Sequence, residues 1–501
     1  MSKFRSASSI ILTRGSGAEL EIYLVHRSPR LRFMGGFWAF PGGTVMEEDY
    51  GKPKAWGEDR AFLYCGLREL FEETGILLGD AAKNLSKTRQ DEIRRRLLNN
   101  EIPESWLALV HSCNVKDNEL LPVCLITTPP YAPVRYRTSF MHASLPDGTE
   151  PVIEEGELVN GEFFTPDAAL RAWERGKMQI APPNLLLLRL ISAHGLPDFF
   201  HEARMQTESF ENGSLLPVYF TPGILMAPQK TPTLPPATTT NTLIVGRDKL
   251  FVLEPATYEQ EEQQRLFEKM DEFIARGKHF ESILLTHHHL DHVGAVTAVS
   301  RRYNLPVRAH PLTYDRIPEG YIRGESLNEG DRIDLGTAPD GSPDWHLRVI
   351  ETPGHAPDHI CYLESRYHAA IVGDMLSTVS TIVIDPPDGH MQTYLCSLER
   401  LLDYPINTLY PSHGPVHLNG SKLIRKFLDH RLEREHKLMR ALTTTPRTVE
   451  DLLPDAYDDV AEEVYPVAAR SLLAGLIKLE EEGKCEQRRR GMEGEGMKFK
   501  V

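Results

Sequence analysis

The sequence predicts a mixed α/β protein of three domains, covering residues 1–200, 201–420 and 421–501. Its length of 501 residues accommodates roughly two to four domains of ordinary size. Over the first 420 residues, short runs of apolar and β-branched residues alternate with helical stretches, which favours layered sheets and helices. From Lys422 onward the pattern is helical and ends in a candidate hairpin, which indicates a separate small domain.

The composition is that of an ordinary globular protein, with 41% hydrophobic and 25% charged residues. No apolar run approaches the roughly 18–20 residues of a membrane helix, so we expect no membrane partner. The formal net charge of −15 argues against bulk electrostatic binding of nucleic acid, although bound divalent metals permit phosphate chemistry. The six cysteines are scattered without a CxxC pair, which is typical of reduced thiols, and we expect a cytoplasmic protein.

The elements follow from periodicity and from proline and glycine positions. In the first domain we expect strands at 9–13 and 21–26 and helices at 61–74 and 91–99. Residues 216–240 are rich in Pro and Thr, and we expect a long loop there. The second domain then alternates β and helix, with expected strands at 241–245, 249–253, 282–286, 307–310, 347–351, 369–372 and 408–410.

Residues 68–76 read RELFEETGI. On a helix, Glu69, Glu72 and Glu73 stand at i, i+3 and i+4 and share one face. A solvated acidic face is one interpretation; a site for hard divalent cations, which prefer oxygen ligands, is the other. The upstream sequence WAFPGG favours the metal site, because Gly42 and Gly43 supply a tight turn that a phosphate chain can approach closely.

Together these motifs resemble the Nudix box, and the resemblance covers most of residues 5–200. It implies an α/β/α sandwich and Mg²⁺- or Mn²⁺-dependent hydrolysis of a diphosphate linked to another moiety. By this resemblance Glu69, Glu72 and Glu73 hold the metals, the last two in a catalytic role. Arg68 orients a glutamate and, with the two glycines, belongs to the binding site.

The box is split. The family pattern has a Gly fourteen residues before the Arg and a Glu eight before it, but Lys54 and Arg60 stand there. An insertion of about eleven residues, 47–57, separates the two halves, and Glu47 or Glu48 is the candidate replacement for the missing Glu. With HRSPRLRFMGGFWAFPGG, the insertion resembles the peroxisomal coenzyme A diphosphatase branch of the family, which implies coenzyme A or acyl-CoA as substrate.

The second motif, THHHLDH at 286–292, follows an expected strand. Three further residues also follow strands, and α/β proteins place their sites at such sheet edges. Imidazole and carboxylate ligands suit borderline cations such as Zn²⁺, and an accidental polar loop is the alternative interpretation. The seven candidate ligands, enough for two metals, are His287, His289, Asp291, His292, His355, Asp374 and His413.

This pattern resembles the metallo-β-lactamase superfamily over about residues 205–420, which implies an αββα sandwich. By the resemblance, two Zn²⁺ ions are held. Site one consists of His287, His289 and His355; site two consists of Asp291, His292 and His413; Asp374 bridges them, and Asp291 is also assigned a catalytic role. Asp374 replaces the site-two cysteine of class B1 β-lactamases, so antibiotic hydrolysis is not expected. Glu254, where Asp is commoner, is expected to matter little for the metals.

The last 81 residues carry 16 basic and 16 acidic side chains and have the helix–helix–helix–wing order of a winged helix. The recognition-like helix is expected at 466–481, with Arg488–Arg490 on the wing. Packing or dimerisation is the alternative to nucleic-acid binding. The arrangement TPGHAPDH, SHG and HRLERE resembles the LACTB2-type branch of the superfamily, which includes an endoribonuclease. His359 matches this branch, with a hydrogen-bonding or a chemical role left open.

We therefore interpret the sequence as two fused metal-dependent hydrolases with a winged-helix tail. The zinc domain is expected to hydrolyse a phosphodiester, including single-stranded RNA, or a thioester. The Nudix domain is expected to hydrolyse a small-molecule diphosphate linked to coenzyme A or a nucleoside. The alternative is a single zinc hydrolase with a non-catalytic Nudix module that senses a ligand and a tail that binds RNA. The oligomeric state stays open.

Overall fold

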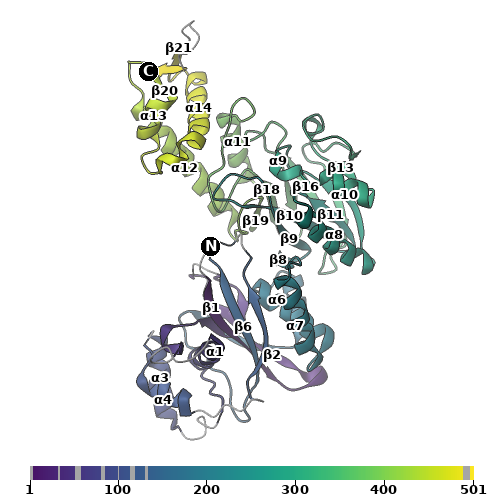
Figure 1. The fold of residues 1–501 in the computed structure, drawn as a ribbon, viewed down its shortest axis with the longest axis vertical. Coiled ribbons are helices and arrows are strands. Elements are labelled where there is room, and N and C mark those ends of the chain that lie inside the picture. Colours follow the sequence, from purple (N-terminus) through teal and green to yellow (C-terminus); the bar gives the residue numbers. More distant parts are fainter. Residues whose placement is uncertain are drawn as a thin grey trace. The chain divides into compact units, whose positions relative to one another are not determined.

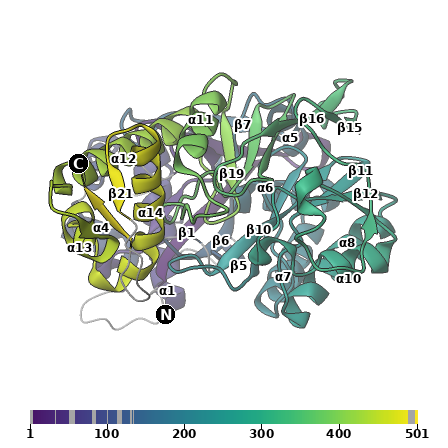
Figure 2. The same ribbon diagram turned by 90° about the horizontal axis from the view of Figure 1, so that it is seen from above.

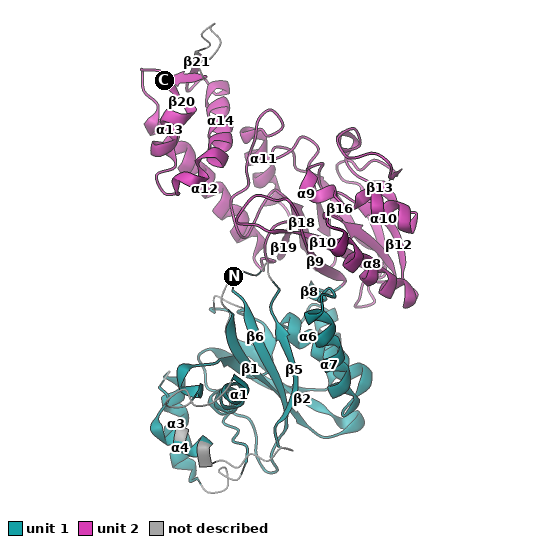
Figure 3. Cartoon of the chain, in the orientation of Figure 1, with its two compact units in different colours: residues 1–222 teal, residues 223–501 magenta. Residues whose placement is uncertain are grey.

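The computed structural model describes residues 4–31, 34–50, 58–79, 85–99, 101–112, 119–129, 132, 134–488 and 497–500. Two compact units divide the chain, unit 1 at residues 1–222 and unit 2 at residues 223–501 (Figure 3). Residue 200, the expected end of the first domain, lies inside α7 (Asp198–Glu211), which packs on β5 (Leu121–Thr127) of unit 1. No helix in the described ranges is long and apolar enough to span a bilayer.

Unit 1 is a sheet between two layers of helices (Figure 1). Its strands are ordered β3–β2–β1–β6–β5, with β4 paired to β1 and β7 paired to β2. Ile10 and Leu12 pack with α1, α3 and α4, whereas Ile11 between them packs with α5, α6 and α7, because successive side chains of a strand face opposite sides. This alternation produces the α/β/α sandwich.

The bounds of these elements, in chain order, are β1 (Arg5–Arg14), β2 (Glu21–Arg27), β3 (Trp38–Ala39), β4 (Gly42–Thr44), α1 (Glu58–Thr74), α3 (Lys87–Leu98), α4 (Glu104–Ser112), β5, β6 (Tyr136–Ser144), β7 (Leu158–Phe164), α5 (Pro166–Glu174), α6 (Pro182–His194), α7 and β8 (Val218–Thr221).

Helix α1 carries the acidic motif and ends at its glycine. Gly75 adopts φ 72°, a conformation that favours glycine, and its N–H donates to the Phe71 carbonyl. The last carbonyls of a helix lack partners within it, and Arg94 of α3 donates to two of them, those of Glu72 and Glu73, at 3.0 Å each. The end of α1 is thereby fixed where the glutamates stand.

Unit 2 contains two larger sheets, with strand orders β14–β13–β12–β11–β10–β9 and β15–β16–β17–β18–β19. Helices α8 and α10 pack on the first sheet, and α11 and α12 share a core with the second (Figures 1 and 2). The sheets are linked where the Ile360 N–H donates to the Thr286 carbonyl and the Tyr362 hydroxyl to the Leu285 carbonyl. This is the expected αββα arrangement.

The bounds of these elements are β9 (Ile224–Lys230), β10 (Thr239–Gly246), β11 (Lys249–Leu253), α8 (Gln260–Ala275), β12 (His279–Leu284), α9 (Leu290–Val293), α10 (Val296–Tyr303), β13 (Pro306–Arg308), β14 (Ile322–Arg323), β15 (Arg332–Gly336), β16 (Trp345–Glu351), β17 (Ile360–Glu364), β18 (Ala369–Gly373), α11 (Met391–Leu401), β19 (Thr408–Pro411) and α12 (Gly420–Ala441).

The expected long loop at 216–240 is wrong. Strands β8 and β9 lie within it, and β9 pairs antiparallel with β10, Pro228 standing opposite Asn241. The Pro and Thr content predicts an irregular segment, but Ile224–Ala227 is a fully buried apolar run. Burial of that run outweighs the unfavourable proline.

The C-terminal region combines α12, α13 (Val449–Ala456) and α14 (Tyr465–Glu481) with a small sheet ordered β20–β22–β21. The strands are β20 (Arg447–Thr448), β21 (Glu486–Arg488) and β22 (Lys498–Lys500). Helix α14 occupies the expected recognition-like helix, and β21 and β22 form the expected hairpin. Two of the expected wing residues, 489 and 490, lie outside the described ranges.

Candidate metal centres

The expected ligands of the histidine site come from separate strand ends of unit 2. The histidine motif follows β12, His355 follows β16, Asp374 follows β18 directly, and His413 follows β19. Because these strand ends meet at one edge, residues up to about 130 positions apart become neighbours. The structure brings together all seven expected ligands, His287, His289, Asp291, His292, His355, Asp374 and His413.

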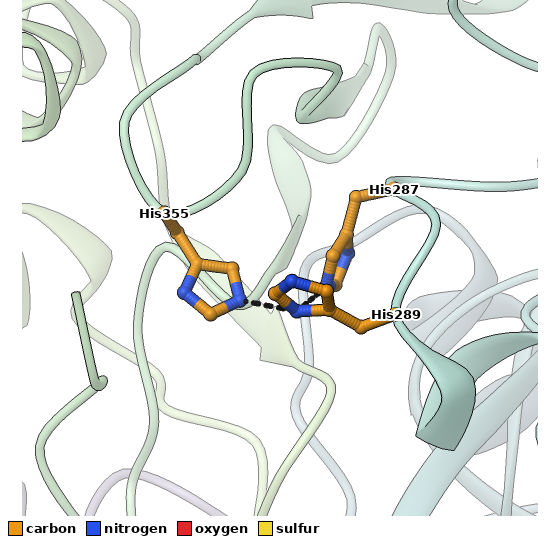
Figure 4. A group of neighbouring side chains, drawn as sticks. All are labelled: His287, His289 and His355. Carbon is orange, nitrogen blue, oxygen red and sulfur yellow. Dashed lines mark hydrogen bonds between the residues drawn. The ribbon is translucent and has the colours of Figure 1, made fainter. Parts of the chain in front are cut away.

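The first group consists of His287, His289 and His355 (Figure 4). Nδ1 of His289 lies 3.1 Å from Nε2 of His287 and 3.0 Å from Nε2 of His355. Zn–N bonds of about 2.0–2.1 Å in a tetrahedral site would separate neighbouring ligand nitrogens by about 3.3 Å. The spacing of the three rings therefore fits a bound cation.

The second group consists of Asp291, His292 and His413. Nε2 of His413 lies 3.4 Å from one oxygen of Asp291, and Nε2 of His292 lies 3.6 Å from the other. His292 is fully buried, and its Nε2 has no hydrogen-bond partner in the part of the chain that the structure describes. An unpartnered buried nitrogen is costly, and a metal ion would satisfy it.

Asp374 lies between the two groups. Its Oδ2 is 3.6 Å from Nε2 of both His355 and His292, and its Oδ1 is 3.3 Å from Nε2 of His413. Its backbone N–H donates to Nε2 of His359, so His359 is a hydrogen-bond acceptor here. This carboxylate is thus shared by both groups, as a bridging ligand would be.

Hydrogen bonds fix which nitrogen of each ring faces the centre. Nδ1 of His355 donates to the Val383 carbonyl at 2.9 Å, and Nδ1 of His413 donates to the Thr239 carbonyl at 2.9 Å. Since a carbonyl only accepts, Nδ1 carries a proton in both rings, and Nε2 is the ring atom that points inward. Imidazole and carboxylate donors in this arrangement fit Zn²⁺ or a similar borderline cation.

The electrostatics also favour a bound cation. Burial, reinforced by His355, lowers the pKa of His289 to about 3, and burial lowers the pKa of His355 to about 4, so both rings are neutral ligands. Burial disfavours the charged form of His413, but Asp374 and Asp291 outweigh it and raise the pKa of His413 to about 10. The buried carboxylates therefore attract positive charge at this position.

Glu254, which the sequence analysis expects to matter little for the metals, contacts the second ligand group directly. Its Oε1 lies 3.1 Å from Nδ1 of His292 and accepts from the Thr286 hydroxyl, and its Oε2 accepts from Ser412 at 2.6 Å. Its φ of 51° is unfavourable for a non-glycine residue, and such strain is typical of functional sites. The available signal was a carboxylate directly after β11, at the edge that carries the histidines.

The acidic motif of unit 1 lies against the glycine turn. The Gly42 N–H donates to Glu73 at 2.9 Å, and Arg68 lies 2.8 Å from Glu69 and 3.5 Å from Glu72. A Cβ on Gly43 would stand 2.4 Å from an oxygen of Glu69, so the carboxylate keeps its present position only beside a glycine. The structure brings together all six expected site residues, the three glutamates, both glycines and the arginine.

The residue of the inserted segment that pairs with Arg68 is Asp49, the neighbour of Glu47 and Glu48, which were the expected replacements for the missing Glu. Its two oxygens accept from Nε and Nη2 of Arg68 at 3.2 and 3.0 Å, and both side chains are almost fully buried. All three acidic residues belong to one 3₁₀ turn (Glu47–Tyr50), and of the three only Asp49 is buried. Which of these carboxylates pairs with Arg68 therefore depends on the conformation of this turn.

Burial opposes ionisation of the motif glutamates. Burial, with Glu69 beside it, raises the pKa of Glu72 to about 7 and raises the pKa of Glu73 well above its usual range. Their oxygens suit Mg²⁺ or Mn²⁺ in chemistry. Among the described residues, however, groups of three ligand atoms within 4.8 Å occur only in unit 2, so this site is less convergent than the histidine site.

Three family models match the chain. Residues 3–182 match the NUDIX domain, residues 234–413 match the Metallo-beta-lactamase superfamily, and residues 448–492 match the Beta-lactamase associated winged helix domain. The probable metallo-hydrolase YqgX of Bacillus subtilis (strain 168) is 32% identical over 144 residues, which are 27% of this chain and 68% of that protein. The chain belongs to the metallo-beta-lactamase superfamily.

Two further matches have lower identities. The Beta-lactamase-like protein 2 homolog of Caenorhabditis elegans is 27% identical over 215 residues, 42% of this chain and 68% of that protein. For unit 1, the crystal structure of a NUDIX hydrolase from Alicyclobacillus acidocaldarius has 25% identity and a TM-score of 0.35, covering 40% of this chain and 95% of that one.

The metallo-β-lactamase domain yields a prediction about Glu254. Replacing it by Gln removes the negative charge beside His292, and we expect the affinity for the metal held there to fall about 10–100-fold with the fold intact. Chelator competition followed by metal analysis measures this. Glu281→Gln, an exposed carboxylate of β12 in the same domain, is the matched control. Equal affinities in both variants would contradict a supporting role for Glu254.

A second prediction concerns Asp49. Asp49→Ala removes the carboxylate that accepts two hydrogen bonds from the buried guanidinium of Arg68, and we expect unit 1 to lose about 3–5 kcal/mol of stability. Arg89→Ala, which breaks the exposed Arg89–Glu92 pair of α3, should cost less than about 1 kcal/mol. Urea unfolding of the full chain measures the free energy of unfolding of both variants. Similar losses of stability would show that the buried Asp49–Arg68 pair contributes no more than an exposed ion pair.

Proposed function

We propose that the histidine site is a two-metal hydrolytic centre that binds two Zn²⁺ ions. The observation that carries the proposal is the position of Asp374, whose oxygens lie 3.3–3.6 Å from ring nitrogens of both ligand groups. His287, His289 and His355 would hold one ion, and Asp291, His292 and His413 the other. When bound, such ions lower the pKa of water and stabilise developing negative charge.

Asp291 would position the attacking water. His292 and His413 outweigh the effect of burial and hold the pKa of Asp291 at about 2, so it is a carboxylate at neutral pH. Its side chain is 19% exposed, whereas that of His292 is fully enclosed. It is therefore the ligand best placed to accept a hydrogen bond from water or substrate entering the site.

We favour a small-molecule thioester as the substrate of this site. Atrochrysone carboxyl ACP thioesterase of Claviceps purpurea (strain 20.1) is 27% identical over 230 residues, 45% of this chain and 68% of that protein. Within α14, both cationic side chains are occupied, since Arg470 pairs with Asp385 and Lys478 pairs with Glu435. This disfavours α14 as a recognition helix for nucleic acid, which needs free cations.

Single-stranded RNA is the second candidate substrate. It is supported by the match of residues 448–492 to the winged-helix model, because winged helices are a nucleic-acid-binding architecture. A phosphodiester and a thioester carbonyl both develop negative charge during hydrolysis, so the ligand set suits either.

We further propose that unit 1 is a Mg²⁺- or Mn²⁺-dependent diphosphatase for coenzyme A or a nucleoside-diphosphate-linked molecule. The match of residues 3–182 to the NUDIX model and the contact between the glycine turn and the glutamates support this. Glu69, Glu72 and Glu73 would hold the metal, and Gly42 and Gly43 leave room for a phosphate to approach. A ligand-sensing module without turnover is the alternative.

For the histidine site, we predict that the zinc-loaded protein releases thiol from acyl-CoA or S-lactoylglutathione. His289→Ala should lose zinc and more than about 100-fold of the activity together. A chromogenic thiol reagent and metal analysis give the two readouts, and Glu72→Gln in unit 1 is the control that keeps thiol release. Activity that survives metal loss would refute the metal assignment, whereas cleavage of RNA without thiol release would favour the second candidate.

For unit 1, we predict that Mg²⁺ supports hydrolysis of the diphosphate bond of coenzyme A or ADP-ribose, so that each product keeps one of the two linked phosphates. Glu72→Gln should lower turnover by about 100-fold or more while His289→Ala leaves it unchanged. Product chromatography with and without Mg²⁺ measures this. Tight binding of either molecule to the wild type without turnover would contradict the diphosphatase and support the sensing module.

A further inference from the structure

The segment 382–390, which we name the brace, lies between the first ligand group and the C-terminal region at 421–501, which we call the winged-helix domain and which includes most of α12. The Val383 carbonyl accepts the Nδ1 proton of His355 at 2.9 Å. This bond sets the tautomer and the orientation of the ring, and therefore the direction in which Nε2 points. Any displacement of this carbonyl would turn His355 away from His289.

The residues on both sides of Val383 are bonded to the winged-helix domain. The Ile382 carbonyl accepts from the guanidinium of Arg431 on α12, and the Ile384 N–H donates to the Ser471 hydroxyl on α14 at 3.0 Å. The next residue, Asp385, lies 3.2 Å from Arg470. Val383 is thus held by consecutive contacts to α12 and α14, although neither helix touches a ligand directly through these side chains.

The far end of the brace is held in the same way. The His390 N–H donates at 2.8 Å to the carbonyl of Gly354, the residue before His355, and its ring lies 3.0 Å from Glu481 of α14. Gly354 adopts φ 130°, and a Cβ there would stand 2.3 Å from the backbone of Tyr394. The loop that carries His355 therefore has little freedom to move except with the brace.

Arg431 is an unusual residue in this role. Its side chain is 5% exposed, and it forms no ion pair with any carboxylate in the described ranges. It lies instead over the Tyr394 ring, whose hydroxyl donates to the carbonyl of Met375, the neighbour of Asp374. Burying a cation that bonds one backbone carbonyl and lies over a ring is expensive, and a hydrophobic residue would pack there at lower cost.

We infer that the winged-helix domain positions the first metal site, with Arg431 and Ser471 as positioning residues that hold the Val383 carbonyl against His355. The inference rests on the proposed role of His355 as a metal ligand. It gives the domain a function inside the hydrolase that does not require nucleic acid. It also gives a role to the contacts that Arg470, Ser471 and Glu481 of α14 make with the brace.

The test compares Arg431→Met and Ser471→Ala with Arg434→Met in the full chain. Arg434 is on the same helix, but it contacts Ala456 and Asp459 within the winged-helix domain and does not touch the brace. Co²⁺ binding is followed by its visible spectrum and by chelator competition, and amide hydrogen exchange is measured for 382–390. The spectrum reports ligand geometry directly, whereas overall stability alone would not change it.

We expect both brace variants to weaken one of two Co²⁺ sites about 10–100-fold, to alter its spectrum and to exchange faster at 382–390. Arg434→Met and the conservative Ser471→Thr should resemble the wild type. If Arg431→Met does not fold, Ser471→Ala decides. An unchanged spectrum and unchanged exchange in Ser471→Ala would overturn the inference. A wild type that binds no metal would contradict the proposed function, and the exchange rates alone would then decide on the brace.

Discussion

The histidine site depends on one carboxylate, that of Asp374. It is nearly buried, its oxygens contact ring nitrogens from both ligand groups, and its backbone N–H is held by His359. Concentrating neutral imidazoles and ionised carboxylates in a dry site is unfavourable unless a cation compensates them. The strand ends, the fixed tautomers of His355 and His413, and the support from Glu254 all serve to hold this arrangement.

In unit 1, the negative charge of clustered carboxylates is balanced by an arginine. Its three motif glutamates are partly buried, but Arg68 lies beside them and Asp49 compensates the arginine. The formal net charge of −15 belongs to the first 420 residues, while the C-terminal region is balanced. In this chain, overall charge says little about whether a phosphate-containing substrate is used.

The parts that the sequence predicts well are those encoded by local spacing. The motifs 68–76 and 286–292 carry their ligands at helix and strand periodicity, and single ligands at strand ends are placed by topology. The roles of Glu254 and Asp49 cannot be predicted from the sequence. They depend on which carboxylate comes close to a histidine ring or a guanidinium that is distant along the chain. Val383 could not be found at all, since a backbone carbonyl has no signature in the sequence. The strand at 224–230 was missed because composition concealed its burial.

X-ray absorption at the zinc edge, on protein loaded with two equivalents of Zn²⁺, tests the central claim most directly. A centre bridged by Asp374 predicts nitrogen and oxygen neighbours only and a metal–metal separation of about 3.5–4 Å. The five described cysteines are free thiols, and none belongs to a ligand group. Sulfur in the first shell, or the absence of a metal–metal distance in protein that holds two ions, would contradict the account.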